Sequence, residues 1–400
     1  MAPYESDDAA SAAQGEDLHS GRRKAARYVV PVAVVGVAAA TIGLVPALAD
    51  SGDPDLPKIT AQQLIEKIAK SDVQQLSGTV KVSTDLGLPD LGGLESSLAS
   101  GAAQGGGSSA DPTSKLTELV SGTHTLRVAT DGPDRQKLSL LESGAEYSLI
   151  HDGKDIWGYD SKSNEVYHGT AADSGKEHRA EPPATPKDFA DEALKSVDDT
   201  TSVTVDGTAQ VAGRDAYKLL IKPKQSGTTV GAISIAVDAK TGMPLKFTLT
   251  PRSGGAAVLD AGFTQVSFAK PAASTFDFTP PKGAKVTEEK EGSKASEHAP
   301  TSGQGFAEGL DGATVLGEGW TSIATFDTGA KGGLPSGSQD GADGAFGGFL
   351  GSLGDQVSGK FGKGTVFSTR LVNALITDDG KVYAGAVTKD TLVKAANEGK

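Results

Sequence analysis

The chain has 400 residues, enough for two or more domains, and it carries a formal net charge of −13 at pH 7. This acidic balance argues against a nucleic-acid binder, since such proteins need a basic patch to displace counterions from phosphates. The sequence has no cysteine, which excludes disulfides, thiolate catalysis, cysteine zinc ligands and lipid attachment through cysteine.

An apolar run without charges at residues 28–49 follows a basic n-region, residues 1–27. Two interpretations are open. The small residues that end at Ala49 are typical of a signal-peptide cleavage site. Alternatively, the run has about the 20 residues that a transmembrane anchor needs. Both interpretations predict that residues 50–400 are extracytoplasmic, either secreted after cleavage near Ala49 or held at the membrane by one N-terminal helix.

The exported part begins with a short amphipathic helix, which we expect at residues 61–70 after the capping residue Thr60. Alternating apolar and polar residues predict a strand at 75–84. A Gly/Ser/Ala-rich insertion follows at residues 85–114. It is either a flexible surface loop, or a mobile lid or membrane-touching finger, since long loops are functional or disordered.

Strand patterns then resume, and the segment His151–Lys154 predicts a hairpin turn between two of them. The expected strands are 124–130, 135–141, 146–150, 155–159 and 164–168. A second helix is predicted at residues 185–196, with Pro186 near its first turn.

Residues 201–285 are predicted to form one strand after another. We expect strands around 205–211, 217–221, 230–237 and 245–249, with residues 276–283 closing the sheet. Arg214 and Asp215 are interpreted as part of a hairpin turn after Gly213.

The C-terminal part is separated by a linker at residues 288–310, which is charged and then Gly/Ser-rich. Residues 311–400 are predicted to be a small β-rich extension. We expect a strand at 319–326, a hairpin of 365–376 with 381–388, and a helical turn at 391–396. Large apolar residues are too sparse here to predict a separate core.

No catalytic, metal or cofactor motif is present, and we predict a non-enzymatic protein without cofactors. The histidines lack metal-ligand spacing, and His124 is interpreted as a structural strand residue. Asp198-Asp199 and Asp378-Asp379 abut predicted turns, where aspartate bonds its own backbone. Trp157 and Tyr159 are interpreted as sheet packing, although they leave open an enzyme that acts on cell-wall polymers.

The order of these elements resembles the bacterial lipoprotein-carrier superfamily of LolA and LolB, whose structural relatives include RseB and LppX-type lipid-binding proteins. The segments that carry the resemblance are LIEKI (64–68), SGTV (77–80), DGKDIWGYD (152–160), AGRDAYKLLIKP (212–223), VDAKTGMPL (237–245) and FDFTPPKGAKV (276–286). The resemblance covers residues 58–287. The chain departs from the family in its insertion, its tail and its lack of a lipid-anchoring cysteine.

The resemblance implies an α+β fold, in which a strongly curved antiparallel half-barrel sheet has helices plugging its concave face. It also implies a ligand cavity for acyl chains on that face. The positions predicted to line the cavity share an apolar side chain on one face of a strand. They are Val80, Leu126, Val128, Leu138, Leu140, Leu149, Leu219, Ile221, Ile233, Ile235, Phe247 and Leu249.

Two functions follow as hypotheses. The first is a lipid- or lipoprotein-binding protein, whose partner is a lipid or an acylated protein and which touches the membrane through residues 28–49 if these are uncleaved. The second is an envelope regulator of the RseB type, which binds an anti-sigma factor or another envelope protein. No nucleic-acid partner is expected.

Overall fold

The structure is a computed structural model that describes residues 54–87, 108–112, 115, 119, 121–170, 185–288, 314–327 and 354–399. The predicted n-region and anchor, most of the insertion, and the linker up to residue 313 lie outside these residues. Within the described ranges, no helix combines the length and the apolar character needed to cross a bilayer.

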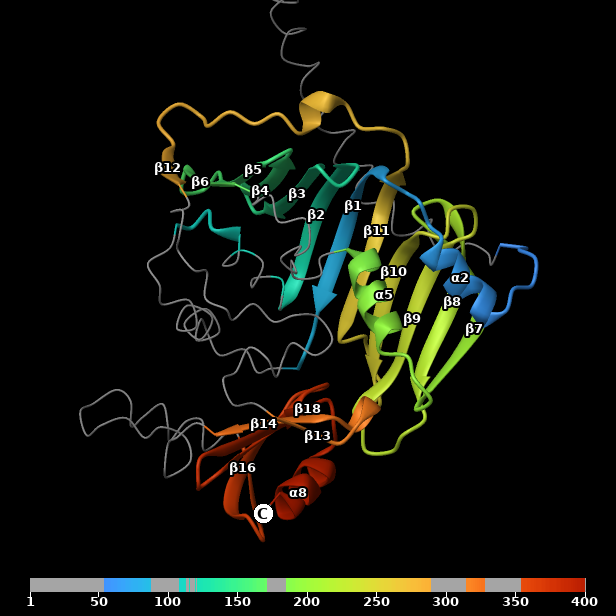
Figure 1. The fold of residues 1–400 in the computed structure, drawn as a ribbon, viewed down its shortest axis with the longest axis vertical. Coiled ribbons are helices and arrows are strands. Elements are labelled where there is room, and N and C mark those ends of the chain that lie inside the picture. Colours follow the sequence, from blue (N-terminus) through green and yellow to red (C-terminus); the bar gives the residue numbers. More distant parts are fainter. Residues whose placement is uncertain are drawn as a thin grey trace, which may run out of the picture. The chain divides into compact units, whose positions relative to one another are not determined.

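The larger part of the described chain is a twelve-stranded open sheet (Figure 1). Its order is β12-β6-β5-β4-β3-β2-β1-β11-β10-β9-β8-β7, so β12 and β7 are its two edges. Neighbouring strands are antiparallel except β12 and β6, which run parallel. The strands are β1 (Gln75–Thr84), β2 (Gly122–Asp131), β3 (Arg135–Glu142), β4 (Ala145–Asp152), β5 (Asp155–Asp160), β6 (Glu165–Thr170), β7 (Thr201–Val211), β8 (Arg214–Pro223), β9 (Val230–Asp238), β10 (Pro244–Pro251), β11 (Leu259–Ser267) and β12 (Lys285–Glu288).

Strand β11 joins the two halves of the sheet, and the sequence did not predict it. It pairs with β1 on one side and with β10 on the other. Leu259, Ala261 and Phe263 alternate with polar or glycine residues, which is a strand pattern. Its only large apolar side chains are Leu259 and Phe263, with Val266 near the end. The alternating pattern that indicates a strand is therefore weak in this stretch.

Two predicted helices are confirmed, and both lie on the same side of the sheet over β8–β10 (Figure 1). Helix α2 (Ala61–Ala69) starts with a capping box between Thr60 and Gln63. Helix α5 (Pro186–Lys195) starts with a capping box between Thr185 and Asp188. Such caps satisfy the first free backbone N–H groups of a helix, which fixes where it begins.

Two details of the second half differ from prediction. Residues 276–283 do not form a strand; a 3-10 helix, η2 (Ala273–Thr275), precedes them, and the closing strand is β12. Phe276 is buried, so this segment packs against the protein through its aromatic side chain instead of pairing as a strand. Arg214 is not a turn residue: Ala212 and Gly213 take the positive-φ positions, and Arg214 starts β8 with an ion pair to the buried Asp238.

The C-terminal residues form a second, six-stranded sheet of order β13-β14-β18-β17-β16-β15. Its own core, with Ile323, Leu375 and Leu392 at its centre, forms despite the sparse apolar residues. The elements are β13 (Thr314–Leu316), the 3-10 helix η3 (Gly319–Thr321), β14 (Ile323–Asp327), β15 (Asp355–Gly359), β16 (Gly362–Ser368), β17 (Asn373–Thr377), β18 (Lys381–Gly385) and α8 (Lys389–Glu398). The expected strand 365–376 is therefore two strands, β16 and β17, joined by a turn.

Candidate ligand-binding face

One face of the large sheet, here called the inner face, carries all twelve positions predicted to line a cavity. In the first half, Val80 lies opposite Leu126, and Leu126 lies opposite Leu140. In the second half, Ile235 lies between Leu219 and Phe247 on its two neighbouring strands. Because directly opposed residues point to the same side of a sheet, these registers align the side chains into one surface.

Strand β11 makes this surface continuous across the middle of the sheet. A register shift between Thr79 and Val80 places Val80 opposite Phe263 and Val82 opposite Ala261. Ala261 in turn lies opposite Phe247 on β10. The inner face therefore runs from β4 to β8 without a polar interruption at the junction.

Most of the predicted positions are buried in the described structure. The buried ones are Val80, Leu126, Leu140, Leu149, Leu219, Ile221, Ile233, Ile235 and Phe247. Val128, Leu138 and Leu249 are half-buried. They are packed as core in two clusters, one on each half of the face. That they line a ligand cavity stays a prediction.

Helices α2 and α5 cover the second half of the inner face by apolar packing. Leu64 and Ile68 of α2 and Ala190 and Ala193 of α5 are buried against β8–β10. Phe189 of α5 stacks on Phe247, with ring centroids 5.5 Å apart. Burying a side chain such as Leu64 contributes about 1.5–3 kcal/mol.

A segment from the end of the insertion covers part of the first half. Ala110 is fully buried there, and its carbonyl oxygen accepts a hydrogen bond of 3.1 Å from the Tyr147 hydroxyl. The approach needs glycine on the strand below, because a Cβ at Gly158 would lie 2.3 Å from the Ala110 carbonyl oxygen. Leu119, further along the segment, packs against the apolar cluster of this half.

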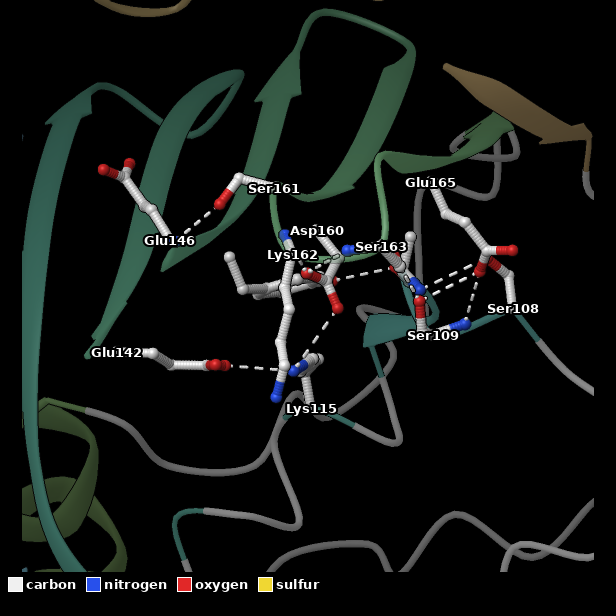
Figure 2. Close-up of polar contacts among 12 residues, drawn as sticks. Ser108, Ser109, Lys115, Glu142, Glu146, Asp160, Ser161, Lys162, Ser163 and Glu165 are labelled. Carbon is white, nitrogen blue, oxygen red and sulfur yellow. Dashed lines mark hydrogen bonds and ion pairs between the residues drawn. The ribbon is translucent and has the colours of Figure 1, made fainter. Parts of the chain in front are cut away.

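Charges hold this segment to the sheet (Figure 2). The Lys115 ammonium lies 3.0 Å from Glu142 and 3.5 Å from Asp160, and the side chains of Lys115 and Asp160 are almost fully buried. Asp160 also accepts hydrogen bonds from the backbone N–H groups of Lys162 and Ser163. A buried charge is tolerated only when it is paired in this way.

A second anchor lies beside it at Glu165, which accepts hydrogen bonds from Ser108 and from both the hydroxyl and the backbone N–H of Ser109 (Figure 2). Lys285 of β12 also donates to Glu165, at 2.9 Å. The Lys285 hydrogen bond, followed by those from the serines, lowers the pKa of Glu165 to about 2. We call Lys115, Glu142, Asp160, Ser108, Ser109 and Glu165 the polar latch.

The start of the insertion is tied down at a different place. Arg370, between β16 and β17, pairs with Asp85 at 2.5 Å and also donates to the backbone carbonyls of Asp85 and Ala256. The backbone N–H of Arg370 donates to the carbonyl of Leu86. Both described ends of the insertion therefore carry specific contacts, whereas the residues between 87 and 108 lie outside the description.

Residues of the C-terminal part contact the start of β7 and the loop between β8 and β9. Trp320 donates from its indole to the Thr201 hydroxyl and from its backbone N–H to Gln225, at 2.8 and 2.7 Å. The backbone N–H of Thr229 donates to the carbonyl of Ala386.

The other residues weighed for chemistry have structural partners. His124 contacts the Ser121 carbonyl at 2.6 Å. Asp198 accepts hydrogen bonds from Thr200, which lower the pKa of its carboxyl, as expected for a turn. Trp157 stacks on His168. Among the described residues, no group of three or more metal-ligating side chains gathers.

Sequence reasoning missed the polar latch. Lys115 lies after a Gly/Ser-rich stretch that has no periodicity, and its partners follow 27 and 45 positions later, at Glu142 and Asp160. A lone lysine carries no signal of burial. The one available signal is Gly158 inside a predicted strand, because glycine at such a position often marks the close approach of another backbone segment.

No protein-family model matches the chain, and no curated protein matches it in sequence. Among solved structures, it is similar to the complex structure of Pseudomonas aeruginosa MucA/MucB, at 16% identity and a TM-score of 0.38, covering 84% of this chain and 96% of that one. It is also similar to the LolA superfamily protein NE2245 from Nitrosomonas europaea, at 10% identity and a TM-score of 0.22, covering 55% and 99%.

A third similar structure is a putative outer membrane lipoprotein-sorting protein domain from Vibrio parahaemolyticus, at 12% identity and a TM-score of 0.20, covering 52% of this chain and 91% of that one. The lipoprotein-carrier resemblance predicted from the motifs thus recurs among solved structures. All three TM-scores lie below 0.5, so the function proposed next rests on the residues of this chain.

Proposed function

We propose that the protein is an extracytoplasmic, non-enzymatic binding protein that takes up acyl chains of a lipid or an acylated protein on its inner face. The observation that carries this proposal is the continuous apolar surface from β4 to β8, covered by separate short segments instead of a second sheet. Apolar surface attracts acyl chains at about 25 cal/mol per Å² removed from water.

Helices α2 and α5, which cover the second half of the inner face, can move without disrupting the strand pairing of the sheet. They make no strand pairing with it and pack on it through apolar side chains, and Lys67 of α2 donates a hydrogen bond to the carbonyl of Lys240. If they shift outward, Leu219, Ile235 and Phe247 become the floor of a groove. Ligand binding then replaces helix packing by acyl-chain packing, so that little net apolar area is exposed.

Native mass spectrometry and lipid extraction of the gently purified full chain test the proposal, together with titration of a fluorescent fatty acid. We expect co-purifying lipid and saturable binding. A matched pair of variants locates the site: Leu249→Gln lies on the inner face, whereas Leu220→Gln lies on the opposite face, and both side chains are half-buried. We expect only Leu249→Gln to weaken binding. Absence of both lipid and dye binding would overturn the proposal.

The second candidate is a regulator that binds another envelope protein. The observation that favours it is the edge strand β13 of the C-terminal sheet, where Val315 is 55% exposed. An unpaired strand edge with an exposed apolar side chain can accept a strand from a partner.

Crosslinking of Val315→Lys and Val286→Lys variants in intact cells tests this candidate, because Val286 is a similarly exposed valine on the edge strand β12 of the other sheet. We expect a crosslinked envelope protein that is lost only with Val315→Lys. Equal crosslinking in both variants would count against the candidate.

A further inference from the structure

A cavity of about 490 Å³ opens on the outer face of the large sheet, the side opposite the apolar surface. Its floor comes from β1, β2, β3 and β11, and its polar lining includes Ser77, Thr79, Lys137, Gln265, Ser267 and Thr275. Ser77 and Thr79 alternate with the inner-face residue Val80, so they point the other way.

One side of the cavity is formed by the segment after β11, which includes Thr275 of η2. This segment is firmly held. Phe276 is buried, and Phe278 packs on Trp157 and Tyr159, with ring centroids 5.5 and 5.8 Å apart. The cavity is therefore built between the sheet and a packed segment, instead of being a dent in a surface loop.

The charges in the cavity do not balance. Its charged lining residues are Arg127, Lys137 and Glu146. Arg127 lies 4.0 Å from Glu146, so this cation has an anionic neighbour. Lys137 is half-buried and makes no ion pair or hydrogen bond with any residue that the structure describes. Its cross-strand neighbours on the same face are Ala129 and Ile150, which offer no acceptor side chain.

We propose that this cavity binds a small polyhydroxylated anion, a sugar acid or a sugar phosphate, whose carboxylate or phosphate pairs with Lys137. A half-buried ammonium group without a partner is destabilised by its partial loss of water, and an anion that binds beside it offsets this cost with a charge-assisted hydrogen bond. The hydroxyls of Ser77, Thr79 and Ser267 and the amide of Gln265 can donate and accept, as sugar hydroxyls require. The volume lies within the 300–1,000 Å³ typical of small-molecule sites.

This site is independent of the proposed acyl-chain site because the two lie on opposite faces of the sheet. Isothermal titration calorimetry of the full chain with glucuronate and with glucose 6-phosphate tests it, with glucose as the uncharged comparison. We expect at least one of the two anions to bind and glucose to bind at least tenfold more weakly. Glucuronate and the phosphate distinguish a carboxylate from a phosphate ligand.

Lys137→Gln should weaken binding of the anion roughly tenfold to a hundredfold, the range for one charged hydrogen bond. Lys222→Gln, at an exposed lysine on β8, should leave it unchanged. In the unaltered chain, the bound anion should protect Lys137, but not Lys222, from acetylation by an amine-reactive reagent. Failure of both anions to bind, equal binding of glucose, or binding and protection that do not depend on Lys137 would overturn the proposal.

Discussion

The two halves of the inner face are covered by different physical means. Over β8–β10, α2 and α5 are held mainly by apolar packing, which includes the stacked pair Phe189 and Phe247. Over β4 and β5, the short segment around Ala110 is held by the polar latch. Apolar packing is non-directional and involves no charges that pH or ionic screening can change, whereas the polar latch depends on charge and geometry.

The largest effect is expected from the packed half. Phe247→Ala should lower the free energy of unfolding by about 4 kcal/mol, because it leaves a cavity beneath Phe189. Thr248→Ala, at the next residue and on the outer face, removes only a 3.4 Å hydrogen bond to Asp260 and should change it by about 1 kcal/mol or less. Urea unfolding in low and high salt measures both. A salt-dependent loss in Phe247→Ala would break the comparison, since packing alone would then not explain the cover.

The next largest loss of unfolding free energy is expected at the polar latch. Lys115→Met should cost about 3 kcal/mol, because it leaves the carboxylate of Asp160 buried without its cation. The control is Lys70→Met, which removes an exposed pair with Glu66 and should cost less than about 0.5 kcal/mol. Urea unfolding provides the measurement, and hydrogen exchange at Ala110 shows whether the loss is local. An equal, small effect of both substitutions would mean that the latch does not hold the cover.

A smaller effect is expected from pH. The pKa of Glu165 is lowered to about 2 from an ordinary value of 4.5. Its contribution to stability is therefore fully present above pH 4.5 and is lost as the pH falls toward 2. Between pH 5 and 3 the unaltered chain should lose more stability than Glu165→Gln, which has no carboxyl to protonate there. Identical pH profiles of the two proteins in urea unfolding would remove Glu165 from the latch.

The smallest effect on stability is expected from His168 on β6, which is hydrogen-bonded to Asp155 and Glu288 near the β12 edge of the sheet. Burial lowers the pKa of His168, but hydrogen bonds to Asp155 and Glu288 and their charges outweigh it, so the pKa lies above its ordinary value of 6.5. The stability that these His168 hydrogen bonds contribute, including the one between β6 and β12, is therefore fully present below pH 6.5. It is lost as the pH rises through the raised pKa of His168. NMR titration should give a midpoint above 6.5, lower in Glu288→Gln. A midpoint of 6.5 or less would contradict this contribution of His168.

The sequence predicts most strands of both halves and the helices over the packed half, but it does not predict the segment that covers the latched half, for a physical reason. The two helices are predicted by local signals: the capping residue Thr60 for one, Pro186 near the first turn for the other, and an apolar stripe in each. Alternation assigns Leu219, Ile235 and Phe247 to one face. Lys115 and Glu165 acquire their roles only from partners far along the chain. The same limit hid β11, whose two large apolar side chains gain meaning only beside β1 and β10.

The pairing of β1 with β11 also sets the order in which the molecule can be assembled. Strands β1–β6 and β7–β11 are two runs of consecutive neighbours, and each can form from contacts close in sequence. Their junction joins residues such as Val82 and Ala261, which lie far apart in the chain. Contacts of such high sequence separation form late and slowly. A chain emerging from its N-terminus must therefore keep the backbone edge of β1 unpaired while residues 85–258 are synthesised, until β11 has appeared.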